Sequence, residues 1–165
     1  MPKVALVMGS LSDFKSLEGC IKLLKKFKVE TEVRVISAHR TPEQAAEFAK
    51  SAEERGIEVI LAAAGKAAHL AGVLASMTAL PVIGIPMNSS TMDGLDSLLS
   101  TVQMPTGIPV ATVAINGGGN AALLAVQMLS IKYPELRAAM KEYRAQQTQE
   151  VIERDKEAME MAEKL

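Results

Sequence analysis

Three short polar segments carry the side chains of this chain that could bind anions or move protons. Residues 8–13 (Met-Gly-Ser-Leu-Ser-Asp) combine a glycine, two hydroxyls and free amides at an expected helix start, as a phosphate or diol site does. Residues 37–41 (Ser-Ala-His-Arg-Thr) add a guanidinium that can grip phosphate and an imidazole that titrates near neutral pH. Residues 62–70 (Ala-Ala-Ala-Gly-Lys-Ala-Ala-His-Leu) have small side chains that let a ligand approach backbone amides.

Each segment also has a purely structural interpretation. Ser10 and Asp13 have the spacing of a helix capping box, and Thr41 can cap the helix that follows it. A histidine one turn into a helix of small residues, such as His69, is more often structural than catalytic. Residues 8–13 alone leave both interpretations open, whereas the composition and position of 37–41 favour function.

The elements that must position these segments alternate along the chain. Val4–Met8 is a short apolar run typical of a strand buried on both faces, and 32–36 alternates polar and apolar residues like an edge strand. A capping box formed by Thr41 and Gln44, with Pro42 between them, predicts a helix that ends at Gly56. Further strands are expected at 58–63, 81–86 and 110–115. The other expected helices lie across 17–27, from the 62–70 segment to about 79, at 96–103, and from 117–119 to about 132.

This alternation predicts an α/β fold, a three-layer αβα sandwich around a flavodoxin-like, five-stranded parallel sheet. Ligands of such sheets bind beyond the carboxyl ends of the strands. Because all three polar segments follow expected strands, we expect them to lie together at that edge.

One domain is expected over residues 1–165, with a core at about 3–132 and a long C-terminal helical arm at about 134–163. The apolar residues of the arm are too sparse to fill one groove along its length. The arm is therefore either a solvated, fraying helix or a contact with another subunit, and subunit contact is favoured for its first half. Cys20, on the apolar face of the first helix, is expected to be a core residue.

Composition argues against several classes of protein. A net charge of −1 and only five aromatic residues argue against a nucleic-acid binder. The single cysteine excludes a disulfide framework, and no apolar run approaches the ~20 residues of a membrane span. The N-terminus lacks the apolar segment of a signal peptide, so we expect a cytoplasmic protein.

No cofactor or metal is expected. Residues 117–122 satisfy G-x-G-x-x-A after a strand, but no later strand carries the acidic residue that would hold a ribose. Two histidines, one cysteine and no clustered ligands argue against a zinc site. No segment that follows a strand contains the aromatic residue that flavin usually stacks on.

These segments, in this order, closely resemble those of the class I PurE family, the N5-carboxyaminoimidazole ribonucleotide mutases of purine biosynthesis. Further matches are 80–84 (Leu-Pro-Val-Ile-Gly), 94–98 (Gly-Leu-Asp-Ser-Leu), 102–105 (Val-Gln-Met-Pro) and 120–121 (Asn-Ala), so the resemblance covers about residues 3–145. It implies an isomerase that acts on a phosphoribosyl aminoimidazole carbamate. It also implies a flavodoxin-like subunit assembled as a homo-octamer, with active sites at subunit junctions.

The resemblance further implies roles for individual residues. Ser10, Asp13 and Arg40 would bind the ribose phosphate, and His39 would be the catalytic acid and base. Two residues depart from the family pattern: Lys66 stands where the family usually has glycine, and Ala71 where it usually has proline. Lys66 either pairs with the carboxylate or points outward. The segment Gly65–Leu70 would hold the migrating carboxyl group, so that the expected substrate-binding residues are Gly9, Ser10, Ser12, Asp13, Ser37, Arg40, Gly65, Lys66, His69 and Leu70.

Carboxyl migration from N5 to C4 can proceed by release and recapture of carbon dioxide, because aminoimidazole is already a carbon nucleophile. The protein must then supply confinement, proton transfer and dipoles that face the carboxylate. The sequence Ala-Ala-His-Leu at 67–70 is similar to that of the mutases rather than the class II carboxylases. Two alternatives remain: a carboxylase that uses free carbon dioxide on aminoimidazole ribonucleotide, and a non-catalytic nucleotide-binding module.

Overall fold

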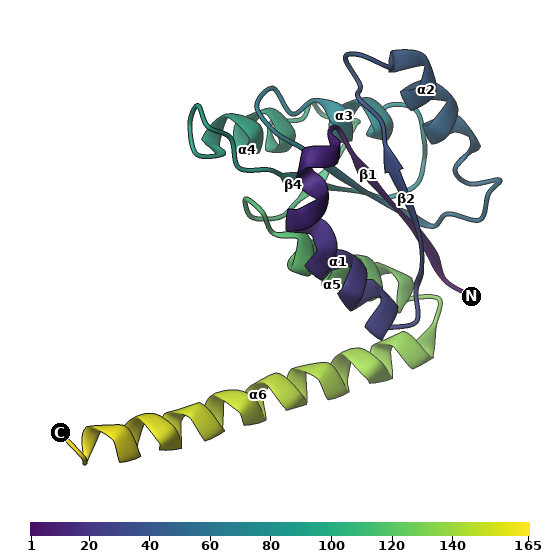
Figure 1. Ribbon diagram of the computed structural model, residues 1–165. Coiled ribbons are helices and arrows are strands. Elements are labelled where there is room, and N and C mark those ends of the chain that lie inside the picture. The colour runs from purple at the N-terminus through teal and green to yellow at the C-terminus, as the bar shows by residue number, and fades with distance from the viewer.

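Five parallel strands form one sheet of order β2-β1-β3-β4-β5 in the computed structural model, which describes residues 1–165 (Figure 1). This order is the flavodoxin-like one, so the predicted fold is confirmed. The strand whose polar and apolar residues alternate is β2, and it lies at the sheet edge, as this pattern predicts. The strands are β1 (Lys3–Met8), β2 (Glu30–Val35), β3 (Val59–Ala64), β4 (Val82–Pro86) and β5 (Ala111–Thr112).

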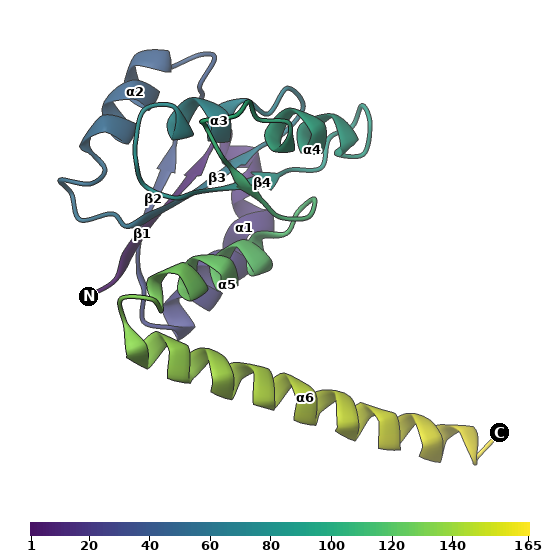
Figure 2. The same ribbon diagram turned by 180° about the vertical axis from the view of Figure 1, so that it is seen from behind.

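Helices cover both faces of the sheet (Figure 2). Val4–Met8 are fully buried because β1 lies in the sheet interior with a helical layer on each side, which explains the unbroken apolar run. On one side are α1 (Phe14–Lys26) and α5 (Gly118–Leu129), and on the other α2 (Pro42–Ser51) and α3 (Leu70–Ala75). A helix α4 (Leu95–Val102) packs against β4, and a 3-10 turn, η1 (Leu11–Asp13), precedes α1.

Several predicted boundaries are wrong. The α2 helix ends at Ser51 rather than Gly56; looser turns follow it, and Gly56 adopts a φ of +76°. The capping box of Thr41 and Gln44 does not form, because the Thr41 hydroxyl is hydrogen-bonded to the Ser37 backbone instead. The α3 helix stops at Ala75, before Thr78, whose hydroxyl accepts a hydrogen bond from a nearby amide in a turn.

The fifth strand is also shorter than the expected 110–115. Only Ala111–Thr112 are in regular pairing with β4. Backbone amides of Val113 and Asn116 still donate to carbonyls of β4, at 3.1 and 2.8 Å, but Asn116 has a φ of +56°. That left-handed residue turns the chain out of the strand, a conformation that asparagine tolerates better than most residues.

The C-terminal helix α6 (Pro134–Ala162) packs differently from the expectation for the arm. Its first half contacts the same chain: Leu136 and Met140 are buried in the core, and Tyr143 meets Phe27 edge to face at 5.6 Å between ring centroids. Its second half is exposed and extends away from the sheet (Figure 1). The prediction that the first half contacts another subunit missed these partners, which come from the preceding helix α5 and from Phe27 at the end of α1, far away in sequence.

Cys20 is buried in the core, as predicted, and burial raises the pKa of its thiol to about 12. A group with that pKa stays protonated at neutral pH and has little nucleophilic character. No helix of the structure is both long and apolar enough to cross a membrane.

Glu58 ties the start of β3 to the turn between α5 and α6. Its carboxylate accepts hydrogen bonds of 2.8 Å from Lys132 Nζ and from the Tyr133 hydroxyl. Partial burial alone would raise the pKa of Glu58, but these bonds and the Lys132 charge outweigh it and lower the pKa below its ordinary value of 4.5. The ionised form is therefore the one that stabilises the fold.

We expect Glu58→Gln to lower the melting temperature by a few degrees at neutral pH. Because the folded-state pKa is depressed, the contribution of Glu58 is fully present above pH 4.5 and is lost as the pH falls through the lowered value. Thermal unfolding of both proteins between pH 3 and 8 checks this. The difference in free energy of unfolding should shrink toward the acid end; a constant difference would contradict it. Glu18→Gln, which removes the exposed pair with Lys22, is the matched control.

Candidate active site

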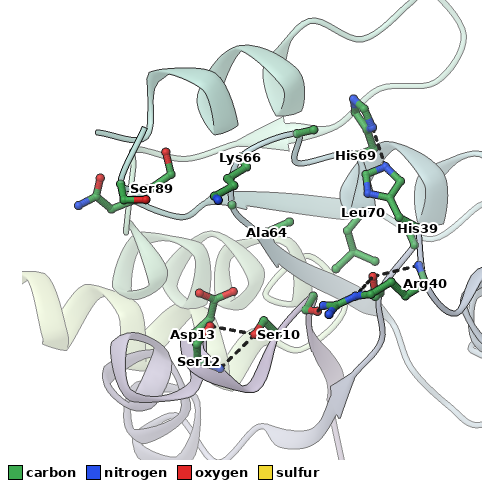
Figure 3. A pocket seen from close by; sticks show the side chains of 17 residues that line it. Ser10, Ser12, Asp13, His39, Arg40, Ala64, Lys66, His69, Leu70 and Ser89 are labelled. Carbon is green, nitrogen blue, oxygen red and sulfur yellow. Dashed lines mark hydrogen bonds between the residues drawn. The ribbon is translucent and has the colours of Figure 1, made fainter. Parts of the chain in front are cut away.

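One open cavity of about 680 Å³ lies where β1, β3 and β4 end and where the segment after β2 turns (Figure 3). Its walls come from all three polar segments, as expected for loops that follow parallel strands. The residues that line it include every site residue expected from the sequence: Gly9, Ser10, Ser12, Asp13, Ser37, His39, Arg40, Gly65, Lys66, His69 and Leu70.

The segment after β1 forms a polar wall at the start of the α1 layer. Ser10 caps η1, since its hydroxyl accepts from the Ser12 amide at 3.3 Å and lies 2.9 Å from the Ser12 hydroxyl. The reciprocal half of a capping box is missing, because Asp13 makes no side-chain hydrogen bond to Ser10. Burial raises the pKa of Asp13 above its ordinary value of 3.8. Because it makes no side-chain hydrogen bond within the protein, the carboxyl group of Asp13 can contact a ligand in the cavity.

Arg40 connects the first and second segments. Its Nε donates to the Ser37 hydroxyl and its Nη2 to the Gly9 carbonyl, both at 3.4 Å, while its backbone amide donates to the same hydroxyl at 3.2 Å. These contacts occupy two of the five N–H groups of the guanidinium. The others remain available for an anion beside Ser10 (Figure 3).

His39 and His69 form a direct pair, although they are 30 residues apart. Nε2 of His39 and Nδ1 of His69 lie 2.9 Å apart, with the rings nearly perpendicular, so one nitrogen donates to the other. Nδ1 of His39 has no hydrogen-bond partner in the protein. This arrangement orients the His39 ring and leaves one nitrogen to exchange a proton with a ligand.

Hydroxyl groups of α4 hold the third segment from behind. Ser100 Oγ accepts from the Ala68 amide at 2.9 Å and lies 3.1 Å from the Lys66 carbonyl oxygen, to which it can donate. Thr101 contacts the Ala68 carbonyl at 3.4 Å. Ala71 lies in the first turn of α3, where proline is also tolerated, so this departure from the family pattern fits the fold.

A fourth wall was missed by the sequence analysis. Asn88, Ser89 and Ser90, which follow β4, line the cavity, as do the small residues Ala38, Ala64 and Ala67. The Ser89 hydroxyl donates to the Asp96 carboxylate at 2.9 Å, which connects this loop to α4. A polar run directly after a strand was visible in the sequence, and it was the signal that could have found this wall.

We expect Ser100→Ala to lower kcat/KM several-fold and the free energy of unfolding by about 1 kcal/mol, because the Ala68 amide loses one of its two acceptors and keeps only the Lys66 carbonyl. Ser130→Ala is the matched control, since its hydroxyl caps α5 far from the cavity through the Gln127 carbonyl. It should lose stability without losing activity. Equal activity losses in the two variants would show that Ser100 does not position the cavity wall.

Comparisons with known proteins all indicate the same family. A family described as AIR carboxylase matches residues 3–150. The chain is 61% identical to the N5-carboxyaminoimidazole ribonucleotide mutase of Pyrococcus abyssi, covering 87% of this chain and 83% of the relative. It is 54% identical to the Thermotoga maritima protein of the same name, covering 93% and 90%. The crystal structure of Treponema denticola PurE superposes with a TM-score of 0.85 at 31% identity, covering 95% and 98%.

Proposed function

The chain belongs to the AIR carboxylase family, and from this premise we propose that it is an N5-carboxyaminoimidazole ribonucleotide mutase of purine biosynthesis. The reaction moves a carboxylate from the exocyclic N5 of the substrate to ring carbon C4. Relatives that bear the mutase name and are 51–61% identical to this chain support the activity. The observation that carries the proposal is a single cavity in which His39 lies between the cation Arg40 and the segment 65–70.

The phosphate end of the substrate is proposed to bind at the Arg40 side. Arg40 keeps free N–H groups beside the Ser10 segment, so it can hold a phosphate with charge-assisted hydrogen bonds. Asp13 can accept hydrogen bonds from the ribose hydroxyls. Gly9, Ser12 and Ser37 complete this end of the cavity.

Carboxyl migration is proposed to occur between His39 and the segment 65–70. The carbon–nitrogen bond breaks and releases carbon dioxide, and the nitrogen takes a proton from the His39 imidazolium. Ring carbon C4 then attacks carbon dioxide, and the neutral His39 removes the C4 proton. His39 therefore ends the reaction with the same number of protons as it had at the start. Gly65 and Leu70 confine the carbon dioxide, and backbone dipoles of the segment face the carboxylate.

Conversion of purified N5-carboxyaminoimidazole ribonucleotide, with and without bicarbonate, tests this function. The mutase should form 4-carboxyaminoimidazole ribonucleotide at the same initial rate in both conditions. Conversion of aminoimidazole ribonucleotide that depends on bicarbonate, with no direct conversion of the carbamate, would instead identify a carboxylase. Ligand binding without any conversion would identify a binding module.

We further propose that the chain works as a homo-oligomer, an octamer by resemblance, in the cytoplasm, where its phosphorylated substrate would be found. Apolar side chains that lie exposed on one subunit support the oligomer, among them Leu95, Leu99 and Val102 on α4 and Val151 and Met159 on α6. Light scattering after size-exclusion chromatography measures the number of subunits, and a monomer would contradict the proposal.

A further inference from the structure

Lys66 stands in a backbone conformation that is costly for its residue type. Its φ is +55°, in the left-handed region where glycine has no penalty and an L side chain has one. The conformation is held by its carbonyl oxygen, which accepts from the Ala68 amide at 2.9 Å and lies 3.1 Å from Ser100 Oγ. The root of the Lys66 side chain is therefore fixed at the cavity wall.

The ammonium group of Lys66 lies over the cavity without a protein counter-ion. No carboxylate is within salt-bridge distance of it: the ion pairs of the protein engage Lys3, Lys22 and Lys132 among the lysines, and none of them involves Lys66. Figure 3 shows Lys66 between Ala64 and Ser89, on a different wall from Arg40. The cavity thus presents two basic side chains, one on each of two separate walls.

We propose that Lys66 binds the carboxylate of the substrate and lets this site distinguish carboxylated from uncarboxylated ribonucleotides. The inference rests on the proposed function, whose substrate carries two anionic groups, a phosphate and a carboxylate. Arg40, beside Ser10, serves the phosphate, and Lys66, on the segment 65–70, serves the carboxylate. An ammonium on a flexible four-carbon stem can follow the carboxylate from N5 to C4.

This role predicts that the loss of the Lys66 ammonium changes KM and kcat differently. Lys66 attracts the carboxylates of substrate and product, but it has no net charge to attract in neutral carbon dioxide. Interactions that favour the bound ground state lower KM without raising kcat. Removal of the ammonium should therefore raise KM and leave kcat no lower than before.

The experiment compares Lys66→Met with the wild-type protein in two measurements. The KM for N5-carboxyaminoimidazole ribonucleotide should rise about 10-fold, the effect of losing one charge-assisted hydrogen bond in an open cavity. The inhibition constant of aminoimidazole ribonucleotide, which has the phosphate but no carboxylate, should stay within about twofold. Lys66→Arg should restore most of the affinity, because it keeps the charge.

Lys28 supplies the matched control, since it is also a lysine with a left-handed backbone, at φ +57°, but does not line the cavity. Lys28→Met should change neither constant. Equal increases for both ligands in Lys66→Met would place the ammonium on the phosphate and overturn the inference, as would no change in KM. If the wild-type protein converts no substrate, the proposed function fails; calorimetry with the product, 4-carboxyaminoimidazole ribonucleotide, and with aminoimidazole ribonucleotide then still tests Lys66.

Discussion

Replacement of His39 by asparagine is expected to lower kcat by about 10²- to 10⁴-fold, the usual contribution of one positioned acid or base. Asparagine has a similar size and can hydrogen-bond, but it cannot carry a proton between N5 and C4. His39 is exposed to the cavity and contributes nothing to the apolar core, so the melting temperature should be nearly unchanged. Initial rates with the purified carbamate measure the effect.

His69→Asn is the companion variant that separates proton transfer from ring orientation. His69 contacts His39 at 2.9 Å and serves to hold its ring, so its loss should lower kcat less than the loss of His39 does. The double variant should be no slower than His39→Asn alone, because the two residues act as a unit. Near-normal turnover in a folded His39→Asn protein would remove His39 from the mechanism.

The sheet was predictable because its strands are buried on both faces. Runs such as Val4–Met8 and 58–63 tolerate few structures other than an interior parallel strand, and parallel connections then leave little choice of topology. The meeting of three polar segments follows from the same constraint, since all of them leave strands at one edge. Their shared cavity could therefore be predicted without any knowledge of side-chain contacts.

Contacts between segments far apart in sequence were not predictable in this way. The pairing of His39 with His69 depends on ring positions that no local pattern encodes. Thr41 could have capped α2, but its hydroxyl bonds to the Ser37 backbone and shapes the loop that presents His39. In the first case tertiary geometry decides the pairing, and in the second a local hydrogen bond four residues away displaces the capping box that the sequence predicts.

Arg40→Met is expected to lower kcat/KM by about 100-fold, mostly through a higher KM. The phosphate would lose its charge-assisted hydrogen bonds, each worth about 1.5–3 kcal/mol. Methionine retains an unbranched apolar stem but supplies no donor. Arg40→Lys should recover only part of the loss, because an ammonium cannot contact Ser37, Gly9 and a phosphate with the geometry of a guanidinium.

The dephosphorylated substrate separates phosphate binding from a general loss of structure. If Arg40 acts on the phosphate, the wild-type protein and Arg40→Met should use the nucleoside carbamate equally poorly, whereas a distorted cavity would make the variant worse with both substrates. Arg34→Met is the matched control, because Arg34 lies on β2 outside the cavity and pairs with Glu32 at 3.4 Å. It should leave KM unchanged. A 100-fold deficit of Arg40→Met that persists with the nucleoside would assign Arg40 to loop structure rather than to substrate binding.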